Sequence, residues 1–145
     1  MKKFIILLFV GLVAFSAIES KAQVYNLLSP YGIASDTAVN TTPTFLSSAA
    51  IAPAPAVTST IEVSVTKLTG TVAGTITLQG SMNGTSWKAL NTPNTVTALA
   101  THTATDASAT YHWIITGSPF PYYRVSWTGV GTMTASFTAK LFRSK

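Results

Sequence analysis

The chain has 145 residues, of which 9% are charged and 47% hydrophobic, and it contains no cysteine. Without cysteine, the protein has no disulfides, thiolate metal ligands, catalytic thiol or iron–sulfur cluster. Globular domains have about 25% charged residues on average, so the low charge content also argues against a charged disordered tail. The length fits one domain.

The N-terminus has the three parts of a secretory signal peptide. Two lysines stand at the start, an almost wholly apolar run covers 4–18, and small residues precede a cleavage site between Ala22 and Gln23. The run is shorter than the roughly 20 residues that a membrane-spanning helix needs. We predict a signal peptide over residues 1–22, and contact with a membrane only through this segment before cleavage. A retained membrane anchor and a buried helix are the alternatives.

Removal of the signal peptide takes away three lysines and one glutamate, which lowers the formal net charge from +5 to +3. The basic residues that remain are scattered, apart from those near the C-terminus. Nucleic-acid binding is typically indicated by a basic stripe interleaved with aromatic residues. The sequence has no such stripe, and we expect no nucleic-acid partner.

Residues 23–56 differ from the rest of the chain because they are rich in proline. The run 49–56 is rich in alanine and proline, a composition that favours an extended linker without ladder hydrogen bonds. One interpretation is an N-terminal arm joined by this linker. The alternative is an edge strand of the following domain that begins near Thr44, because proline is tolerated at sheet edges.

Residues 57–145 alternate between apolar and polar side chains, which predicts β-strands. Turn residues such as Asn83 and Gly84 separate the alternating segments. The strands are expected over 60–66, 75–79, 87–90, 96–103, 110–116, 122–127 and 132–142. About seven or eight strands at this spacing predict an all-β fold, an antiparallel, jelly-roll-like β-sandwich.

Few residues of the predicted mature chain can act as acids or bases. Its carboxylates are Asp36, Glu62 and Asp106, and nothing in their spacing indicates the converging pair that a glycosidase needs. Gly-x-Ser-x-Gly, the Walker loop and Gly-x-Gly-x-x-Gly are also missing. We predict a protein without enzymatic activity and without a cofactor, and keep a hydrolase only as a third alternative.

His102 and His112 are the only histidines of the chain. If 105–109 is the loop of a hairpin, the two side chains lie opposite each other, where they can bind a metal or respond to pH. Only Asp106 is near enough in sequence to serve as a third ligand, so we predict no metal site. The alternative is two half-exposed histidines on neighbouring strands. His112 is kept as a candidate binding residue.

Aromatic residues gather in the C-terminal half of the chain. Exposed tryptophan and tyrosine rings present a large contact area and can stack on sugars. By alternation, Tyr123, Val125 and Trp127 point into the core, whereas Tyr122 and Arg124 point outward. An arginine beside an exposed aromatic ring is a typical recognition pair. Tyr122 and Arg124 are therefore the main candidate binding residues.

Two stretches resemble known β-sandwich proteins. Residues 79–87, QGSMNGTSW, resemble the GS-x-DG-x-x-W hairpin of exported and virion modules, including discoidin-like carbohydrate-binding domains, with Asn83 at the usual aspartate position. Residues 122–132, YYRVSWTGVGT, resemble the YYRV…TG-x-GT strand of small phage virion and tail-associated sandwiches. The resemblance implies a fold more than a function.

These observations lead to two hypotheses. The first is an exported, non-catalytic β-sandwich module that recognises a surface glycan or a protein partner, or packs into an assembly. It would act in the periplasm, at the cell surface or outside the cell. The second is a phage virion structural or decoration protein that forms homo-oligomers through its sheet edges and N-terminal segment.

Overall fold

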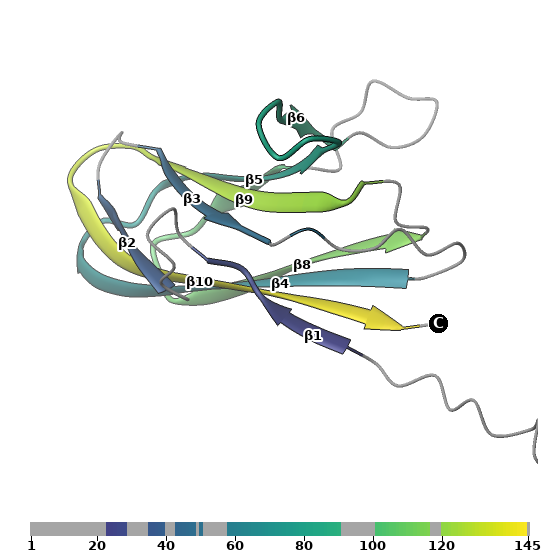
Figure 1. The fold of residues 1–145 in the computed structure, drawn as a ribbon. Helices are drawn as coiled ribbons and strands as arrows, with labels where there is room; N and C mark the ends of the chain where they lie inside the picture. The colour runs from purple at the N-terminus through teal and green to yellow at the C-terminus, as the bar shows by residue number, and fades with distance from the viewer. Residues whose placement is uncertain are drawn as a thin grey trace, which may run out of the picture.

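The computed structural model describes residues 23–28, 35–39, 43–48, 50, 58–90, 101–116 and 120–144. All regular structure in these residues is β-strand, and the ten strands form two antiparallel sheets that lie face to face (Figure 1). The protein is an all-β sandwich, which confirms the predicted fold class. The three strands in excess of the seven expected segments, β1, β2 and β3, all precede residue 57.

Sheet A has the strand order β1–β10–β4–β8, with β2 also paired to β10. Its strands are β1 (Gln23–Asn26), β2 (Ser35–Val39), β4 (Thr58–Gly70), β8 (Ala109–Thr116) and β10 (Met133–Ser144). β1 and β2 pair with successive stretches of β10, residues 140–143 and 134–138. They therefore lie end to end along one edge of the sheet, and β8 forms the other edge.

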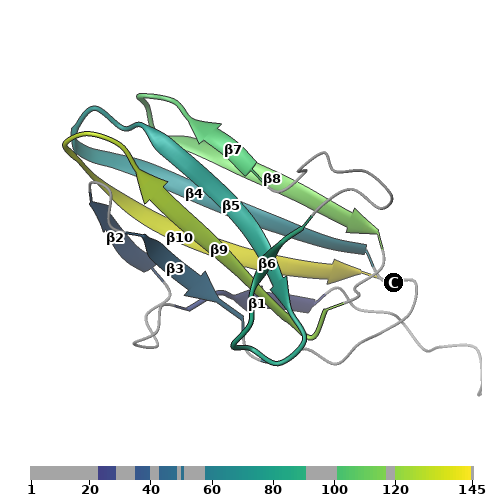
Figure 2. The same ribbon diagram turned by 90° about the horizontal axis from the view of Figure 1, so that it is seen from above.

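Sheet B has the strand order β3–β9–β5–β6, with β7 also paired to β5. Its strands are β3 (Thr44–Ser47), β5 (Gly74–Ser81), β6 (Lys88–Ala89), β7 (Thr101–Ala104) and β9 (Tyr122–Gly129). β9 pairs along the whole of β5, so β6 and β7 share its other side. With β1 and β2 taken as one interrupted strand, the two sheets follow the jelly-roll topology (Figure 2).

The N-terminal strands are hydrogen-bonded to the C-terminal ones. β3 begins at Thr44 and pairs with β9. An edge strand that begins near Thr44 is one of the two arrangements that the sequence predicts for residues 23–56. Main-chain hydrogen bonds between Leu28 and Ser47 (N···O 2.7 and 2.5 Å) link the end of β1 to β3. They connect the two sheets along this edge. All of the Ala-Pro-rich run 49–56 except Ala50 lies outside the described residues.

The core lies between the two sheets and is built by alternation along the long strands. Trp127, Tyr123 and Phe137 are the largest fully buried side chains. β4, β5, β9 and β10 add aliphatic side chains to the same cluster: Ile61, Val63, Val65, Ile76, Leu78, Val125 and Leu141. Burial of one large apolar side chain stabilises the fold by roughly 1.5–3 kcal/mol. The alternation therefore determines which face of each strand points inward.

The connection between β7 and β8 is not the hairpin loop that the sequence predicts. β7 pairs with β5 in sheet B, whereas β8 pairs with β4 in sheet A, so the chain crosses between the sheets here. Asp106 in this crossing accepts hydrogen bonds at Oδ1 from Lys67 Nζ and from the main-chain N of Val72, both at 2.7 Å. A short polar loop suits a hairpin and a crossing equally well, and core packing decides between them.

Candidate functional site

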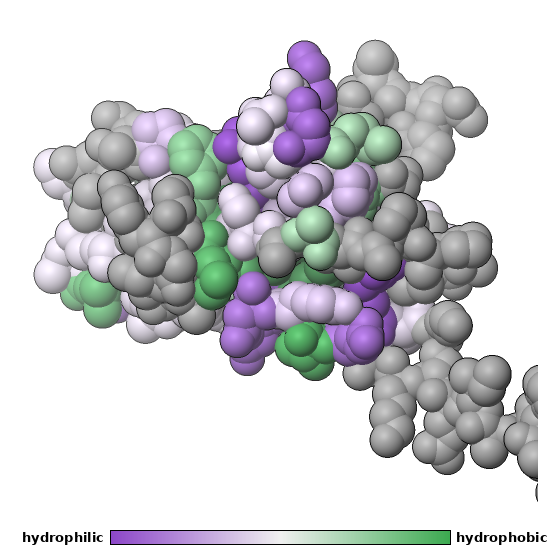
Figure 3. Space-filling view, in the orientation of Figure 1, coloured by the Kyte–Doolittle hydropathy of each residue, from purple (hydrophilic) through white to green (hydrophobic). Residues whose placement is uncertain are grey.

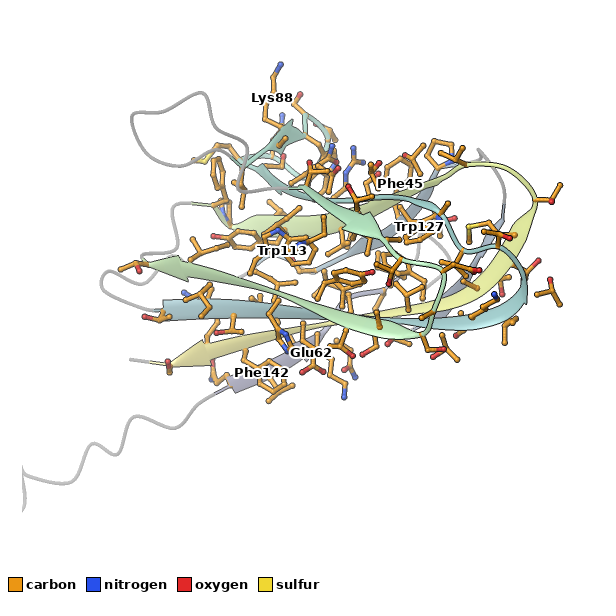
Figure 4. The ribbon with its side chains drawn as sticks, turned by 180° about the vertical axis from the view of Figure 1, so that it is seen from behind. Phe45, Glu62, Lys88, Trp113, Trp127 and Phe142 are labelled. Carbon is orange, nitrogen blue, oxygen red and sulfur yellow. The ribbon has the colours of Figure 1, made fainter. Side chains whose placement is uncertain are left out.

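The outer face of sheet B carries aromatic and polar side chains around an arginine of β9. This group, which we call the Arg124 cluster, consists of Phe45, Gln79, Trp87, Tyr122 and Arg124. The strand register places Gln79 of β5 directly opposite Arg124, and β3 brings Phe45 from the other side of β9. Figure 4 shows Phe45 on the outer side of this sheet, while Trp127 and Trp113 lie between the layers.

The loop between β5 and β6 is fixed by its own side chains and positions Trp87. Ser81 Oγ accepts hydrogen bonds from the main-chain N of Asn83 and Gly84, at 3.3 and 3.0 Å. Asn83 Oδ1 accepts two more from residues 85–86, at 3.0 and 2.8 Å. Gly84 has φ 74°, a left-handed conformation that suits the Asn-Gly turn. Residues 85 and 86 then lead to Trp87, whose ring lies next to Arg124 of β9.

The guanidinium of Arg124 lies between two aromatic rings. Its Cζ atom is 4.4 Å from the ring centroid of Phe45 and 4.6 Å from that of Trp87. Phe45 comes from β3, on one side of β9, and Trp87 comes from the loop that precedes β6, on the other side. Cation–π attraction at such distances favours the stack.

Hydrogen bonding and burial complete the environment of this cation. Arg124 Nε donates a hydrogen bond to Gln79 Oε1 at 2.5 Å. Partial burial lowers the pKa of Arg124 from its ordinary value, but the group stays charged at neutral pH. Within the described part of the chain, its two Nη groups have no hydrogen-bond partner. These Nη groups are the candidate donors for a ligand.

Tyr122 lies beside this stack on the same outer face of β9. A Cβ atom placed on Gly84 would lie 3.4 Å from the Tyr122 ring, so the ring packs directly against the β5–β6 loop. The alternation of β9 therefore gives the outward orientation of Tyr122 and Arg124 that the sequence predicts. Phe45 and Gln79 come from distant strands, and only the sheet register brings them to this site.

His112 lies far from the Arg124 cluster, on the outer face of sheet A. Its Nε2 atom is 3.2 Å from Glu62 Oε2 on the neighbouring strand β4. His102 instead points into the sandwich, where its ring contacts those of Tyr111 and Trp113 at centroid distances of 5.3 and 4.7 Å. The predicted opposition of the two histidine side chains is therefore wrong, because β7 and β8 belong to different sheets.

The carboxylates whose side chains are described, Glu62 and Asp106, do not converge. Glu62 lies on the outer face of sheet A, whereas Asp106 lies in the β7–β8 crossing and bonds to Lys67. These bonds, together with that from Val72, hold the pKa of Asp106 below its ordinary value. No group of three or more His, Asp or Glu side chains that could hold a metal ion occurs among the described residues.

The predicted signal peptide, residues 1–22, lies outside the described residues, and Gln23 is the first residue of β1. No helix in the part of the chain that the structure describes is long and apolar enough to span a membrane.

No protein-family model and no curated protein matches this chain. The fold is similar to a family 16 carbohydrate-binding module, with a TM-score of 0.43 and 10% identity over 79% of this chain and 82% of that one. It is similar to the enzymatically active domain of tailspike protein 4 of bacteriophage CBA120, with a TM-score of 0.49 and 6% identity over 87% and 18%. For the N-terminal cellulose-binding domain of a Cellulomonas fimi β-1,4-glucanase, the TM-score is 0.39 and the identity 12%, over 85% of each chain. At these TM-scores the likenesses carry no argument about function.

Proposed function

We propose that this protein is an exported, non-catalytic recognition module that binds saccharides through the Arg124 cluster. The observation that carries the proposal is the Arg124 guanidinium, which lies 4.4 and 4.6 Å from the Phe45 and Trp87 ring centroids and whose Nη groups bond to no described residue. Rings supply apolar surface for a sugar face, and fixed donors supply orientation. The hydrogen bond from Arg124 to Gln79 and the hydrogen bonds within the β5–β6 loop hold both groups in position, which lowers the entropy lost on binding.

The geometry of the stack indicates the kind of oxygen that the ligand presents. Because two rings pack against the guanidinium and Nε bonds to Gln79, we infer that the ligand meets the edge that carries the Nη groups. Two parallel N–H donors match a carboxylate or sulfate better than a single hydroxyl. We infer that acidic saccharides, such as uronate polymers, bind more tightly than neutral ones.

The absence of catalysis is part of the proposal and is supported by the acid groups. Glycoside hydrolysis uses two carboxyl groups at a defined separation across the bond that is cleaved. The two described carboxylate side chains, Glu62 and Asp106, lie on different parts of the fold and bond to His112 and Lys67. Neither faces the Arg124 cluster.

Affinity electrophoresis through gels that contain single polysaccharides tests this function. We expect polygalacturonate or alginate to retard the protein, and neutral xylan or cellulose derivatives to retard it less. Arg124→Ala and Trp87→Ala should each weaken binding at least about tenfold, as removal of a central interface residue does. Thr128→Ala, an exposed position on the same face of β9, is the matched control. The proposal fails if no polysaccharide retards the protein, or if the two variants and the control bind alike.

A virion structural role is the second proposed function. It is favoured by Val24 and Ile114, two exposed apolar side chains on the outer face of sheet A, which a protein that assembles from copies can bury. The first proposed function includes export, with cleavage between Ala22 and Gln23. The second includes incorporation into a virion.

A further inference from the structure

The strand register of sheet A aligns four side chains in one row across its outer face. Val24 of β1 is opposite Phe142 of β10, Phe142 is opposite Thr60 of β4, and Thr60 is opposite Ile114 of β8. The two ends of the row are the most open, since Val24 is 57% and Ile114 71% exposed. Figure 3 shows a hydrophobic spot between hydrophilic residues at the β1 edge. Exposed Val24 and Ile114, with half-buried Phe142 between them, give this face apolar surface that a protein partner can bury.

A second row, one step along the strands on the same face, is polar and charged. It runs from Asn26 through Lys140 and Glu62 to His112. Figure 4 shows Glu62 and Phe142 together on this outer face, on the opposite side of the molecule from Phe45. Lys140 is exposed and has no hydrogen-bond or ion-pair partner in the described residues.

We propose that this face binds a second copy of the chain around a two-fold axis that runs parallel to the strands, between β10 and β4. Such an axis exchanges β10 with β4 and β1 with β8. It places Lys140 opposite the partner's Glu62, and Val24 opposite the partner's Ile114. Phe142 comes to lie on the partner's Thr60. Each contact occurs twice, as in any two-fold interface between identical chains.

Charge complementarity identifies a second copy as the occupant. The two charges of opposite sign stand on the two central strands, directly on either side of the axis, where the twist of facing sheets displaces them least. The same operation brings the two apolar ends of the row together. No other axis through this face pairs both the charges and the apolar ends. The arrangement leaves both Arg124 clusters on the outside of the dimer, facing opposite directions.

Charge reversal at the two positions tests the interface, with sedimentation velocity and light scattering as the measurements. We expect the purified protein to be a dimer at high micromolar concentration. Lys140→Glu and Glu62→Lys should each place like charges across the axis twice and raise the dimer Kd at least about tenfold. An equimolar mixture of the two variants should form a heterodimer, because each introduced charge then meets its opposite on the partner.

The mixture separates this interface from effects inside one chain. Lys140 and Glu62 are also neighbours on adjacent strands, so either reversal changes the stability of the monomer. An effect confined to the monomer cannot produce a heterodimer on mixing. Ile114→Asp should yield monomers, while Thr128→Asp on the outer face of sheet B should leave the dimer intact. A wild-type protein that is monomeric at high concentration, or variants that fail to associate when mixed, would overturn the proposal.

Discussion

The stack in the Arg124 cluster predicts a measurable coupling between Trp87 and Arg124 in the folded protein. Cation–π contacts are worth about 0.5–1 kcal/mol at exposed sites and about 2 kcal/mol when desolvated. The distance from Arg124 Cζ to the Trp87 ring centroid is 4.6 Å, and the arginine is partly buried, so the pair lies between the two limits. We expect a coupling free energy of about 1 kcal/mol.

A double-mutant cycle measures this coupling. The free energy of unfolding is obtained from urea denaturation of the wild type, Trp87→Ala, Arg124→Ala and the double variant. Loss of the Gln79 hydrogen bond occurs in both variants that lack the arginine, so it cancels in the cycle. Independent sites are additive to within about 0.3–0.5 kcal/mol. A coupling inside that range would show that ring and guanidinium do not interact in solution, and would refute the reasoning behind the site.

Three further predictions concern stability and processing. Gly70→Ala should lower the free energy of unfolding by at least about 2 kcal/mol more than Gly131→Ala does. The reason is that a Cβ at Gly70 would lie 2.2 Å from a main-chain oxygen, whereas nothing lies within 4 Å at Gly131. Equal unfolding midpoints would contradict this. The pKa of Asp106 is lowered in the fold. Its contribution to the free energy of unfolding is therefore present above the ordinary pKa of 3.8 and is lost as the pH falls below that value. Unfolding free energies should therefore decline more steeply with acidification in the wild type than in Asp106→Asn, and parallel curves would exclude this role. N-terminal sequencing of the secreted protein should begin at Gln23, and an uncleaved N-terminus would count against the signal peptide.

Period-two alternation predicted most of the sandwich because each long strand has one buried face. In β9, buried Tyr123, Val125 and Trp127 alternate with outward residues, and the same pattern runs along β10. The short N-terminal strands β1 and β2 have too few residues to show a period. Their positions are determined by pairing with β10 at the far end of the chain, which local sequence cannot reveal.

The candidate site was predictable only in the part that lies on one strand. Tyr122 and Arg124 follow from the alternation of β9, whereas Phe45 and Gln79 depend on which strands neighbour it. The histidine pair failed for a related reason. Pairing across a short loop assumes a hairpin, and here the loop joins two sheets, so His102 fills the interior between them.

The indole resonances of the three tryptophans test the central claim, saccharide recognition by the Arg124 cluster, most directly. The measurement is a ¹H–¹⁵N NMR titration with uronate oligomers. The signals of buried Trp113 and Trp127 serve as internal controls, since both side chains are almost wholly inaccessible. We predict that addition of the ligand shifts the indole signal of Trp87 and the amide signals of 122–124 together. The indole signals of Trp113 and Trp127 should not shift. Shifts confined to the outer face of sheet A, or none at all, would contradict the account.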